Sequence, residues 1–418
     1  MKHYEAIIIG GGSAGLSAAC TLKEKGINDI VVLEKDIEPG GILQQCIHNG
    51  FGLQTFKEQL AGPAYAERFA TKAKELGITV KLNTMVTKLS NDRIVEYVNG
   101  EEGYVTCSAD VVILAVGCYE RHRGAVEIPG ERPAGVYTAG QAQRYLNMDG
   151  YRVGNRCFIL GSGDIGLIMA RRMTLEGAKV LGVAELMPYS NGLPRNIKQC
   201  LTDFDIPLYL SHTVTHIYGK DRLERIEVSE VGKDLKPIPG TEQYFDVDTL
   251  LLSTGLIPEN HLAEMADITL NPRTKGPIVD ENYMTSAEGI FACGNGLHVH
   301  DLVDYVTLES SRAAEGAVRY LNGGKPAGKV VHSVAGDGIG YVVPGEIHPE
   351  TIDHHVEFFF RVRKPMDVGT IIVKCNDRVI RSVKKTKLMP SEMERMLLTN
   401  KMLQELDGDL VIEVKEGE

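Results

Sequence analysis

The chain has 418 residues, 43% of them hydrophobic. It contains 45 Lys and Arg and 56 Asp and Glu, which give a formal net charge of −11. This length predicts two to three domains with ample cores, and the acidic balance argues against nonspecific binding to nucleic acid. No apolar run approaches ~20 residues and a strand is predicted almost at the N-terminus, so neither a membrane span nor a signal peptide is expected.

A glycine-rich turn opens the first predicted βαβ unit. The apolar run 6–9 predicts a strand, and a G-x-G-x-x-G motif follows it at residues 10–15. Its first glycine permits the sharp turn, its second lets a pyrophosphate approach the backbone, and its third lets the helix predicted over 13–22 pack closely. The next strand, 31–33, ends at Glu34, which lies 19 residues after the motif and suits a ribose. This pattern predicts a dinucleotide site.

The same pattern recurs about 150 residues later. A strand over 157–160 is followed by the glycine motif 161–166, a helix over 167–175 and a strand over 179–184 that ends at Glu185. A lone motif is weak evidence, but two complete units predict two dinucleotides on one chain. Two such sites favour one flavin and one nicotinamide cofactor, and this pairing predicts hydride transfer.

Glu185 favours NAD over NADP in the second unit. A 2′-phosphate would be repelled by this carboxylate and would need a nearby arginine. The residues at 186–189 are Leu-Met-Pro-Tyr, and the nearest arginine downstream is Arg195.

Two further apolar strands are predicted over 111–116 and 249–253. They end at Gly117 and at Thr254-Gly255, and each is expected to carry the chain past a cofactor before it crosses between domains. The Ile-Pro-Gly sequence at 128–130 is a predicted crossing point.

With these motifs, the chain resembles the two-dinucleotide-binding flavoproteins of the pyridine nucleotide–disulfide oxidoreductase type, most closely the thioredoxin reductase-like members, over residues 1 to about 325. Further marks are Leu-Ala-Val-Gly at 114–117, Leu-Ser-Thr-Gly at 252–255 and residues 285–295, which are similar to the family's second FAD fingerprint. That fingerprint usually ends in Asp, where this chain has Asn295 and loses a charge.

The resemblance implies an α/β fold with two Rossmann-like domains, the NAD domain inserted in the FAD domain. The tail lies outside the resemblance, and its own residue pattern predicts a small β-rich C-terminal domain. The predicted boundaries are 1–128 and 259–328 for the FAD domain, 129–258 for the NAD(P) domain and 329–418 for the last. The predicted cofactor-binding residues are Gly10, Gly12, Ser13, Ala14, Gly15, Glu34, Lys35, Gly41, Ala115, Gly117, Gly161, Gly163, Asp164, Ile165, Gly166, Glu185, Gly255, Gly294 and Asn295.

A helix over 302–321 follows the fingerprint. The resemblance implies that its positive N-terminus faces the flavin pyrimidine and stabilises negative charge there. Asp301 and Asp304 fit its first turn, either as helix-end acids or in a catalytic role.

The chain lacks the paired cysteines of disulfide reductases. Residues 137–143 hold no cysteine, residues 40–48 hold only Cys46, and no two of the eight cysteines are spaced C-x-x-C. This argues against a dithiol relay, an iron–sulfur cluster and a cysteine zinc site, and scattered cysteines suggest a reducing cytoplasm. Cys46 is a packing residue, a single redox thiol as in NADH peroxidase-like flavoenzymes, or part of a substrate or electron-exit face.

Three histidines lie near the predicted flavin site. His48 is a loop or core histidine, or a general base close to Cys46. His298 and His300 could contact flavin or substrate, and their spacing without nearby acids predicts no metal site.

Residues 40–46 and 135–146 resemble a narrower subgroup, the flavoprotein subunits of multi-component dehydrogenases such as opine oxidase, cyanide-forming glycine dehydrogenase and those associated with anaerobic glycerol-3-phosphate dehydrogenase. The resemblance implies a second flavoprotein subunit as partner. Several members carry a C-terminal cysteine cluster for iron, which is missing from this sequence.

The tail is predicted to be rich in strands, at 355–362, 370–374, 378–383 and 410–414, with one helix over 391–403. Ser391 and Glu394 have the spacing of a capping box at the start of that helix. Between residues 361 and 387 there are nine Lys and Arg against two Asp, which suit a solvated strand face or a docking surface for a partner.

These features predict a cytoplasmic FAD-dependent NAD(P)H oxidoreductase that passes hydride between NADH and FAD, and electrons to or from a partner flavoprotein or small acceptor. Two alternatives stay open. One is a stand-alone NADH peroxidase or oxidase that uses Cys46, with His48 as the second catalytic candidate. The other is a non-catalytic, flavin-containing interaction subunit. Homo-oligomerisation is left open as well.

Overall fold

The computed structural model of the chain describes residues 1–417. They divide into two compact units: unit 1 holds Met1–Cys118 and the residues from Pro258 onward, and unit 2 holds Tyr119–Ile257. The predicted NAD(P) segment begins later, at residue 129, and the cofactor of each domain stays a prediction.

Unit 1 is built on a seven-stranded sheet in the order β5-β2-β1-β8-β7-β6, with β19 also paired to β8. β1 runs parallel to β2 and β8, and Ile9 lies opposite both Leu33 and Leu114. These apolar strands therefore end at one edge of the sheet, so the residues that follow them must share that edge. The strands are β1 (Lys2–Ile9), β2 (Ile30–Leu33), β5 (Thr79–Lys81), β6 (Met85–Leu89), β7 (Ile94–Asn99), β8 (Gly103–Leu114) and β19 (Ile290–Ala292).

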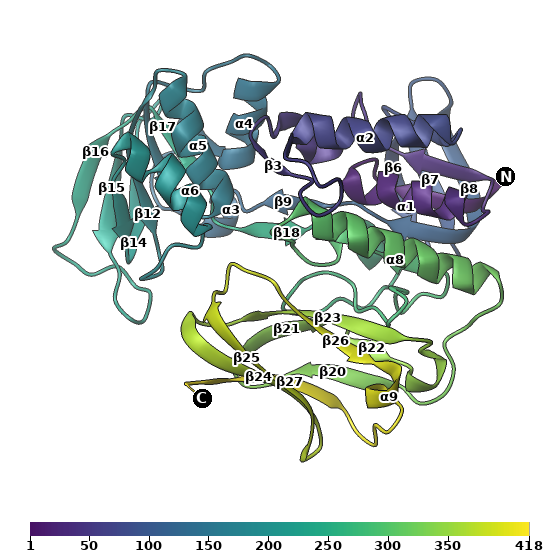
Figure 1. Cartoon of the computed structure of the whole chain (residues 1–418). Coiled ribbons are helices and arrows are strands. Elements are labelled where there is room, and N and C mark those ends of the chain that lie inside the picture. Colours follow the sequence, from purple (N-terminus) through teal and green to yellow (C-terminus); the bar gives the residue numbers. More distant parts are fainter. Residues whose placement is uncertain (418) are drawn as a thin grey trace. The chain divides into compact units, whose positions relative to one another are not determined.

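Two helices from opposite ends of the sequence pack side by side in unit 1 (Figure 1). They are α1 (Ser13–Glu24) and α8 (Val303–Leu321), and the second begins one residue later than predicted. Small residues let them approach closely: Ser17 Oγ donates a hydrogen bond to the carbonyl oxygen of Thr307 at 3.1 Å. This contact brings the fingerprint that precedes α8 towards the first glycine turn.

Six further helices and short strands belong to unit 1 ahead of its C-terminal sheets. They are η1 (Gly41–Gln45), β3 (Asn49–Phe51), β4 (Leu60–Ala61), α2 (Gly62–Glu75), α7 (His261–Met265) and η3 (Gly294–Gly296). Of these, α2 packs against α1. No helix in residues 1–417 combines the length and the apolar character that crossing a membrane requires.

Unit 2 repeats the plan with a parallel five-stranded sheet in the order β10-β17-β11-β12-β13. Leu160 lies opposite both Ala184 and Leu252, so the residues that follow these three strands again share an edge. The sheet strands are β10 (Val136–Thr138), β11 (Arg156–Leu160), β12 (Lys179–Glu185), β13 (Leu208–Leu210) and β17 (Thr249–Leu252), and the helices are α3 (Arg123–Val126), α4 (Ala139–Asn147), α5 (Asp164–Leu175), α6 (Pro194–Cys200) and η2 (Thr202–Phe204).

Two smaller sheets complete this part of the chain. β14 (His212–Tyr218), β15 (Arg225–Glu230) and β16 (Gln243–Asp246) form an antiparallel sheet of unit 2. β9 (Cys118–Glu120) pairs with β18 (Leu256–Pro258), and the unit boundaries fall within these two strands.

The C-terminal part of unit 1 is rich in strands, as predicted. One sheet has the order β22-β20-β27-β24-β25 and the other β21-β23-β26, and they enclose a separate core that includes Phe358 and Phe360. Their elements are β20 (Val331–Ala335), β21 (Ile339–Val343), β22 (Glu346–Ile347), η4 (Pro349–Thr351), β23 (His355–Val362), β24 (Met366–Cys375), β25 (Arg378–Leu388), β26 (Glu394–Thr399), α9 (Asn400–Leu403) and β27 (Leu410–Glu416). The α/β class, with two Rossmann-like units and a β-rich C-terminal region, is confirmed.

The helix predicted over 391–403 is wrong for most of its length. Residues 394–399 form strand β26, paired antiparallel with β23, and only Asn400–Leu403 are helical. Met396 and Leu398 are buried while their neighbours are more exposed, which is the period of a half-buried strand. Pairing with β23 overrides the local capping pattern of Ser391 and Glu394.

The basic hairpin of β24 and β25 carries less free charge than its composition suggests. Lys374 pairs with Glu413, and Arg378 pairs with Glu405. β25 lies at the edge of its sheet, where positively charged side chains also discourage pairing with another strand. Its role as a docking surface stays a prediction.

Candidate functional site

The first glycine turn packs so tightly that only glycine fits two of its positions. Gly10 has φ +106°, and a Cβ there would lie 2.4 Å from the carbonyl oxygen of Ala115. A Cβ on Gly15 would lie 1.8 Å from the carbonyl oxygen of Gly10. The end of β1, the start of α1 and the end of β8 therefore meet in backbone contact.

Gly12 is different, because the space beside it is open. It is the N-cap of α1 with φ −75°, and a Cβ there would meet only the Cα of Gly41, at 3.9 Å. No side chain caps this helix end, so its first amide groups are available to an anion. This cradle fits a pyrophosphate, as expected for bound FAD.

Other predicted FAD residues gather at the same edge. A Cβ on Gly294 would lie 3.0 Å from the Cβ of Ala14, and one on Gly41 would lie 3.1 Å from the Cα of Gly12. Gly117 has φ +74° with open space around it, and Lys35 is exposed next to Glu34. Gly41, Ala115 and Gly294 are thus brought to the glycine turn from segments far apart in sequence.

Glu34 ties the end of β2 to the glycine turn. Its side chain is buried; Oε2 accepts a hydrogen bond from the amide of Gly11 at 2.6 Å, and Oε1 accepts one from the amide of Asp36 at 2.8 Å. A carboxylate has about four acceptor positions, so these two bonds leave others for ribose hydroxyls.

Glu185 makes the same contacts in unit 2. Its Oε2 accepts hydrogen bonds from the amide and the hydroxyl of Ser162, at 3.0 and 2.6 Å, and Oε1 accepts one from the amide of Met187 at 3.0 Å. Gly11 and Ser162 are each the second residue of their motifs. Both turns are therefore locked to their strand by one glutamate in one pattern, which supports the same kind of ligand in each.

The second glycine turn has the same mixture of tight and open positions. A Cβ on Gly161 would lie 2.0 Å from the carbonyl oxygen of Ser253, and one on Gly166 would lie 2.7 Å from that of Gly161. Gly163, the uncapped N-cap of α5, has φ −65°, and its nearest atom would be the Oγ of Ser253 at 3.5 Å. Ile165 follows in the first turn of α5, and Gly255 adopts φ +107° after β17.

A loop over 187–193 is fastened to this turn. Asp164 Oδ1 accepts hydrogen bonds from the amide of Leu193 at 2.8 Å and from the side chain of Asn196 at 2.7 Å. Ser162 Oγ accepts one from the amide of Asn191 at 3.1 Å. Asp164, a predicted cofactor residue, is thus engaged in holding the loop beside the cradle.

Asn295 of the FAD fingerprint holds its own loop. Its Oδ1 accepts a hydrogen bond from the amide of His300 at 3.0 Å, and its Nδ2 donates to the Sγ of Cys118 at 3.6 Å. Asn295, which replaces the usual Asp, therefore holds the segment that leads into α8 in place.

Sequence analysis missed Glu309, whose side chain contacts the two histidines that follow the fingerprint. Its carboxylate is 2.7 Å from His298 Nε2 and 3.1 Å from His300 Nε2, and it accepts the amide hydrogen of Gly294 at 2.7 Å. Burial alone would raise the pKa of Glu309, but the two imidazoles hold it below its ordinary value, while burial lowers the pKa of His298. The buried face of α8 also carries Asp304, Thr307 and Ser310, so the sequence pattern of this helix gave no clear signal for Glu309.

Asp301 and Asp304 have structural partners. Asp301 accepts hydrogen bonds from Arg361 at 2.6 Å and from the amide of Met393 at 3.0 Å, so it binds the C-terminal strands. Asp304 accepts those of the Gly52 and Thr55 amides, at 3.2 and 2.7 Å. These contacts favour the structural reading of both acids.

Cys46 and His48 follow η1. The Sγ of Cys46 donates to the carbonyl oxygen of Ile42 at 3.3 Å, and burial raises the pKa of the Cys46 thiol to about 12. The ring of His48 lies 5.0 Å from that of Phe51. A thiol with so high a pKa is a poor nucleophile at neutral pH.

Comparison with known proteins places this site in context. Residues 4–315 match the family described as pyridine nucleotide-disulphide oxidoreductase. Hydrogen cyanide synthase subunit HcnB of Pseudomonas protegens is 25% identical over 332 residues, 74% of this chain and 67% of that protein. The glutamate synthase (NADPH) small chain of Escherichia coli is 27% identical over 353 residues, 75% and 68% of the two chains. The crystal structure of T. acidophilum thioredoxin reductase has the same fold, with a TM-score of 0.63 at 22% identity over 77% of this chain and 100% of that one.

Proposed function

Because this chain belongs to the pyridine nucleotide-disulphide oxidoreductase family, we propose that it passes hydride between NADH and FAD and exchanges electrons with a second protein subunit. The family establishes the broader activity: the protein is an FAD-dependent NAD(P)H oxidoreductase. The observation that carries the proposal is the pair of glycine turns, each open at its helix N-cap and each locked by one glutamate through the same hydrogen bonds.

The chain's own groups would bind and orient the two dinucleotides. The free amides at the start of α1 would hold the FAD pyrophosphate, and Glu34 would accept hydrogen bonds from its ribose. Bound FAD supplies a two-electron carrier that accepts hydride from a nicotinamide. The uncapped N-terminus of α8 would place positive potential near the flavin pyrimidine.

Two observations support a partner subunit: the site lacks a cysteine pair, and similar proteins are named as subunits of larger enzymes. Cys46 is the one cysteine between residues 40 and 48, residues 137–143 have none, and the eight cysteines form no disulfide. HcnB is a subunit and the glutamate synthase relative is a small chain, so both belong to larger assemblies. Electrons would then leave for a second subunit rather than for a disulfide, and eight cysteines without a disulfide suit a reducing cytoplasm.

Cys46→Ser is expected to leave electron transfer unchanged. Under anaerobic conditions NADH should bleach the flavin absorbance of the variant at the wild-type rate, because hydride transfer needs no thiol. Peroxide turnover should be equally slow in both proteins, because the half-buried Cys46 thiol, with its pKa raised to about 12, supplies almost no thiolate. Stopped-flow absorbance and a peroxide assay measure these rates.

Cys200→Ser is a matched control, because burial raises the pKa of Cys200 as well, to about 11. Rapid NADH-dependent peroxide turnover that disappears only in Cys46→Ser would establish the peroxidase function instead. Failure of NADH to bleach the flavin of the wild type would favour the non-catalytic flavin subunit.

NADH is expected to be preferred over NADPH, and Glu185→Gln is expected to weaken that preference. The buried carboxylate of Glu185 would repel a 2′-phosphate, whereas glutamine keeps acceptor and donor groups without the charge. Removing about 1.4 kcal/mol of repulsion would lower the NADH-to-NADPH ratio of kcat/KM about tenfold. Steady-state kinetics with both nucleotides measure this ratio, and Glu176→Gln, at an exposed position, serves as the control. An unchanged ratio in Glu185→Gln would mean that Glu185 does not select the nucleotide.

A further inference from the structure

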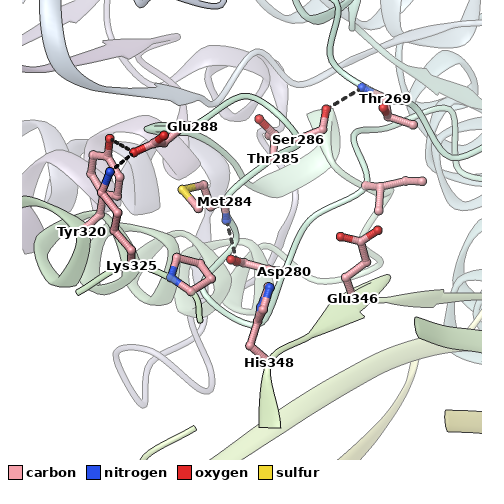
Figure 2. A pocket seen from close by; sticks show the side chains of 12 residues that line it. Thr269, Asp280, Met284, Thr285, Ser286, Glu288, Tyr320, Lys325, Glu346 and His348 are labelled. Carbon is pink, nitrogen blue, oxygen red and sulfur yellow. Dashed lines mark hydrogen bonds and ion pairs between the residues drawn. The ribbon is translucent and has the colours of Figure 1, made fainter. Parts of the chain in front are cut away.

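A cavity of about 330 Å³ opens in unit 1, among residues that belong to neither glycine turn (Figure 2). Two stretches supply its polar floor: a turn that precedes β19 contributes Asp280, and the end of β22 contributes Glu346 and His348. Figure 2 shows Glu288, Tyr320 and Lys325 at the other side, joined by their own hydrogen bonds.

Three potential ligand atoms converge at this floor. Asp280, Glu281 and His348 each offer one carboxylate or imidazole atom, and all of these atoms lie within 4.8 Å of one another. His348 Nδ1 is 3.2 Å from Glu281 Oε2, although the two residues are 67 positions apart in sequence. Asp280 is 5% exposed, and the side chains of Glu281 and His348 are 5% and 13% exposed.

The cluster is held in place by contacts around it. Glu281 Oε2 accepts a hydrogen bond from the amide of His348 at 3.0 Å, and Oε1 accepts one from the hydroxyl of Thr351 at 3.1 Å. Asp280 Oδ1 accepts the amide hydrogens of Asn282 and Met284, at 2.8 and 2.9 Å. Partners of this kind orient ligands to a metal ion.

Among the described residues, no lysine or arginine neutralises the two carboxylates of this cluster. Within residues 1–417 neither Asp280 nor Glu281 has an ion pair with Lys or Arg, and the imidazole of His348, which is charged only when protonated, is the one basic group that pairs with Glu281. Asp280 Oδ2 makes no hydrogen bond with the described residues, although its side chain lines the cavity and is almost fully buried. The Asp280 carboxylate therefore has one oxygen left to bind a cation in the cavity.

We propose that Asp280, Glu281 and His348 bind one divalent transition-metal ion, such as Mn²⁺ or Zn²⁺, with water in the cavity completing its coordination. One imidazole and two carboxylates suit these ions better than Mg²⁺ or Ca²⁺, which prefer oxygen ligands throughout. The ion would replace the proton between His348 Nδ1 and Glu281 Oε2 and neutralise the two carboxylates. The proposal departs from the expectation of no metal site, and it does not depend on the proposed electron transfer.

The other histidine–glutamate cluster, formed by His298, His300 and Glu309, is a weaker candidate. Its side chains have no exposure at all, and the Glu309 carboxylate already serves the amide of Gly294 and both imidazoles. It offers no opening to water of the kind that the cavity gives Asp280. Variants of the two clusters therefore distinguish the two locations.

The test is Mn²⁺ binding to the full chain, loaded with FAD and first dialysed against a chelator. The electron paramagnetic resonance signal of free Mn²⁺ should fall until one ion is bound per chain, and Zn²⁺ should displace it because it binds nitrogen and oxygen ligands more tightly. Asp280→Asn and His348→Gln should each raise the Kd for Mn²⁺ at least about tenfold. Glu288→Gln, a carboxylate of the same cavity that pairs with Lys325, should leave the Kd unchanged.

Several results would overturn the site. These are no Mn²⁺ bound to the wild type, an unchanged Kd in both Asp280→Asn and His348→Gln, or an equal loss in Glu288→Gln. Loss of binding only in His300→Gln would place the ion at the other cluster. Circular dichroism and flavin absorbance verify folding, and if Asp280→Asn does not fold, the partly exposed His348→Gln decides the outcome.

Discussion

Gly12→Val is expected to give a folded protein that no longer retains FAD. Valine can adopt the φ of −75° at this position, and its Cβ would meet no protein atom closer than 3.9 Å. Its methyl groups would instead occupy the space in front of the α1 amides, where the pyrophosphate must approach the backbone. A clash of about 1.4–2.8 kcal/mol, within the usual cost of overpacking, weakens binding by about 10- to 100-fold.

The measurement is the flavin-to-protein absorbance ratio after purification, followed by titration of the apoprotein with FAD. Gly15→Ala provides the contrast, because its Cβ would lie 1.8 Å from the Gly10 carbonyl oxygen and should lower the melting temperature strongly. Gly12→Val should melt close to the wild-type apoprotein, because substitution at a helix N-cap costs only on the order of 1 kcal/mol. A yellow Gly12→Val protein with wild-type affinity would move the pyrophosphate away from this turn.

The glycine turns could be predicted because their determinants are local. Consecutive residues determine the strand, the tight turn and the helix. The register that sets Ile9 opposite Leu33 and Leu114 follows because the apolar strands end together. The positions of Glu34 and Glu185 followed from spacing alone. What spacing did not reveal is that each carboxylate also bonds the second residue of its own turn.

The failures concern contacts between distant segments. Ser391 and Glu394 satisfy a local helix pattern, yet pairing with β23 makes a strand of residues 394–399. Glu309 reaches His298 and His300, although it follows them by only 11 and 9 positions, because α8 folds back beside the fingerprint, and no spacing rule joins these positions. Glu281 and His348 meet across 67 positions because the amides of Gly345 and Glu346 bond the carbonyl oxygen of Val279. Clusters assembled by tertiary structure leave no fixed spacing in the sequence.

Because the two glycine turns have the same structure, the same substitution should impair the binding of a different cofactor in each. Gly163→Val is expected to keep FAD and to lose reduction by NADH. Gly163 has φ −65° and, like Gly12, open space beside an uncapped helix N-terminus, with Ser253 Oγ as the nearest atom at 3.5 Å. Valine would fill the position where a nucleotide pyrophosphate approaches α5, so the affinity for NADH should fall by about 10- to 100-fold.

Anaerobic stopped-flow reduction at several NADH concentrations measures this effect, and dithionite should still bleach the flavin of Gly163→Val, because chemical reduction needs no nucleotide site. The loop over 187–193 gives the matched control. Asn196→Ala removes one hydrogen bond from Asp164 without filling the cradle, so it should change the NADH concentration dependence far less than Gly163→Val. Unimpaired reduction of Gly163→Val by NADH would mean that the hydride donor binds elsewhere, and loss of FAD from this variant would mean that the two turns do not divide the cofactors between them.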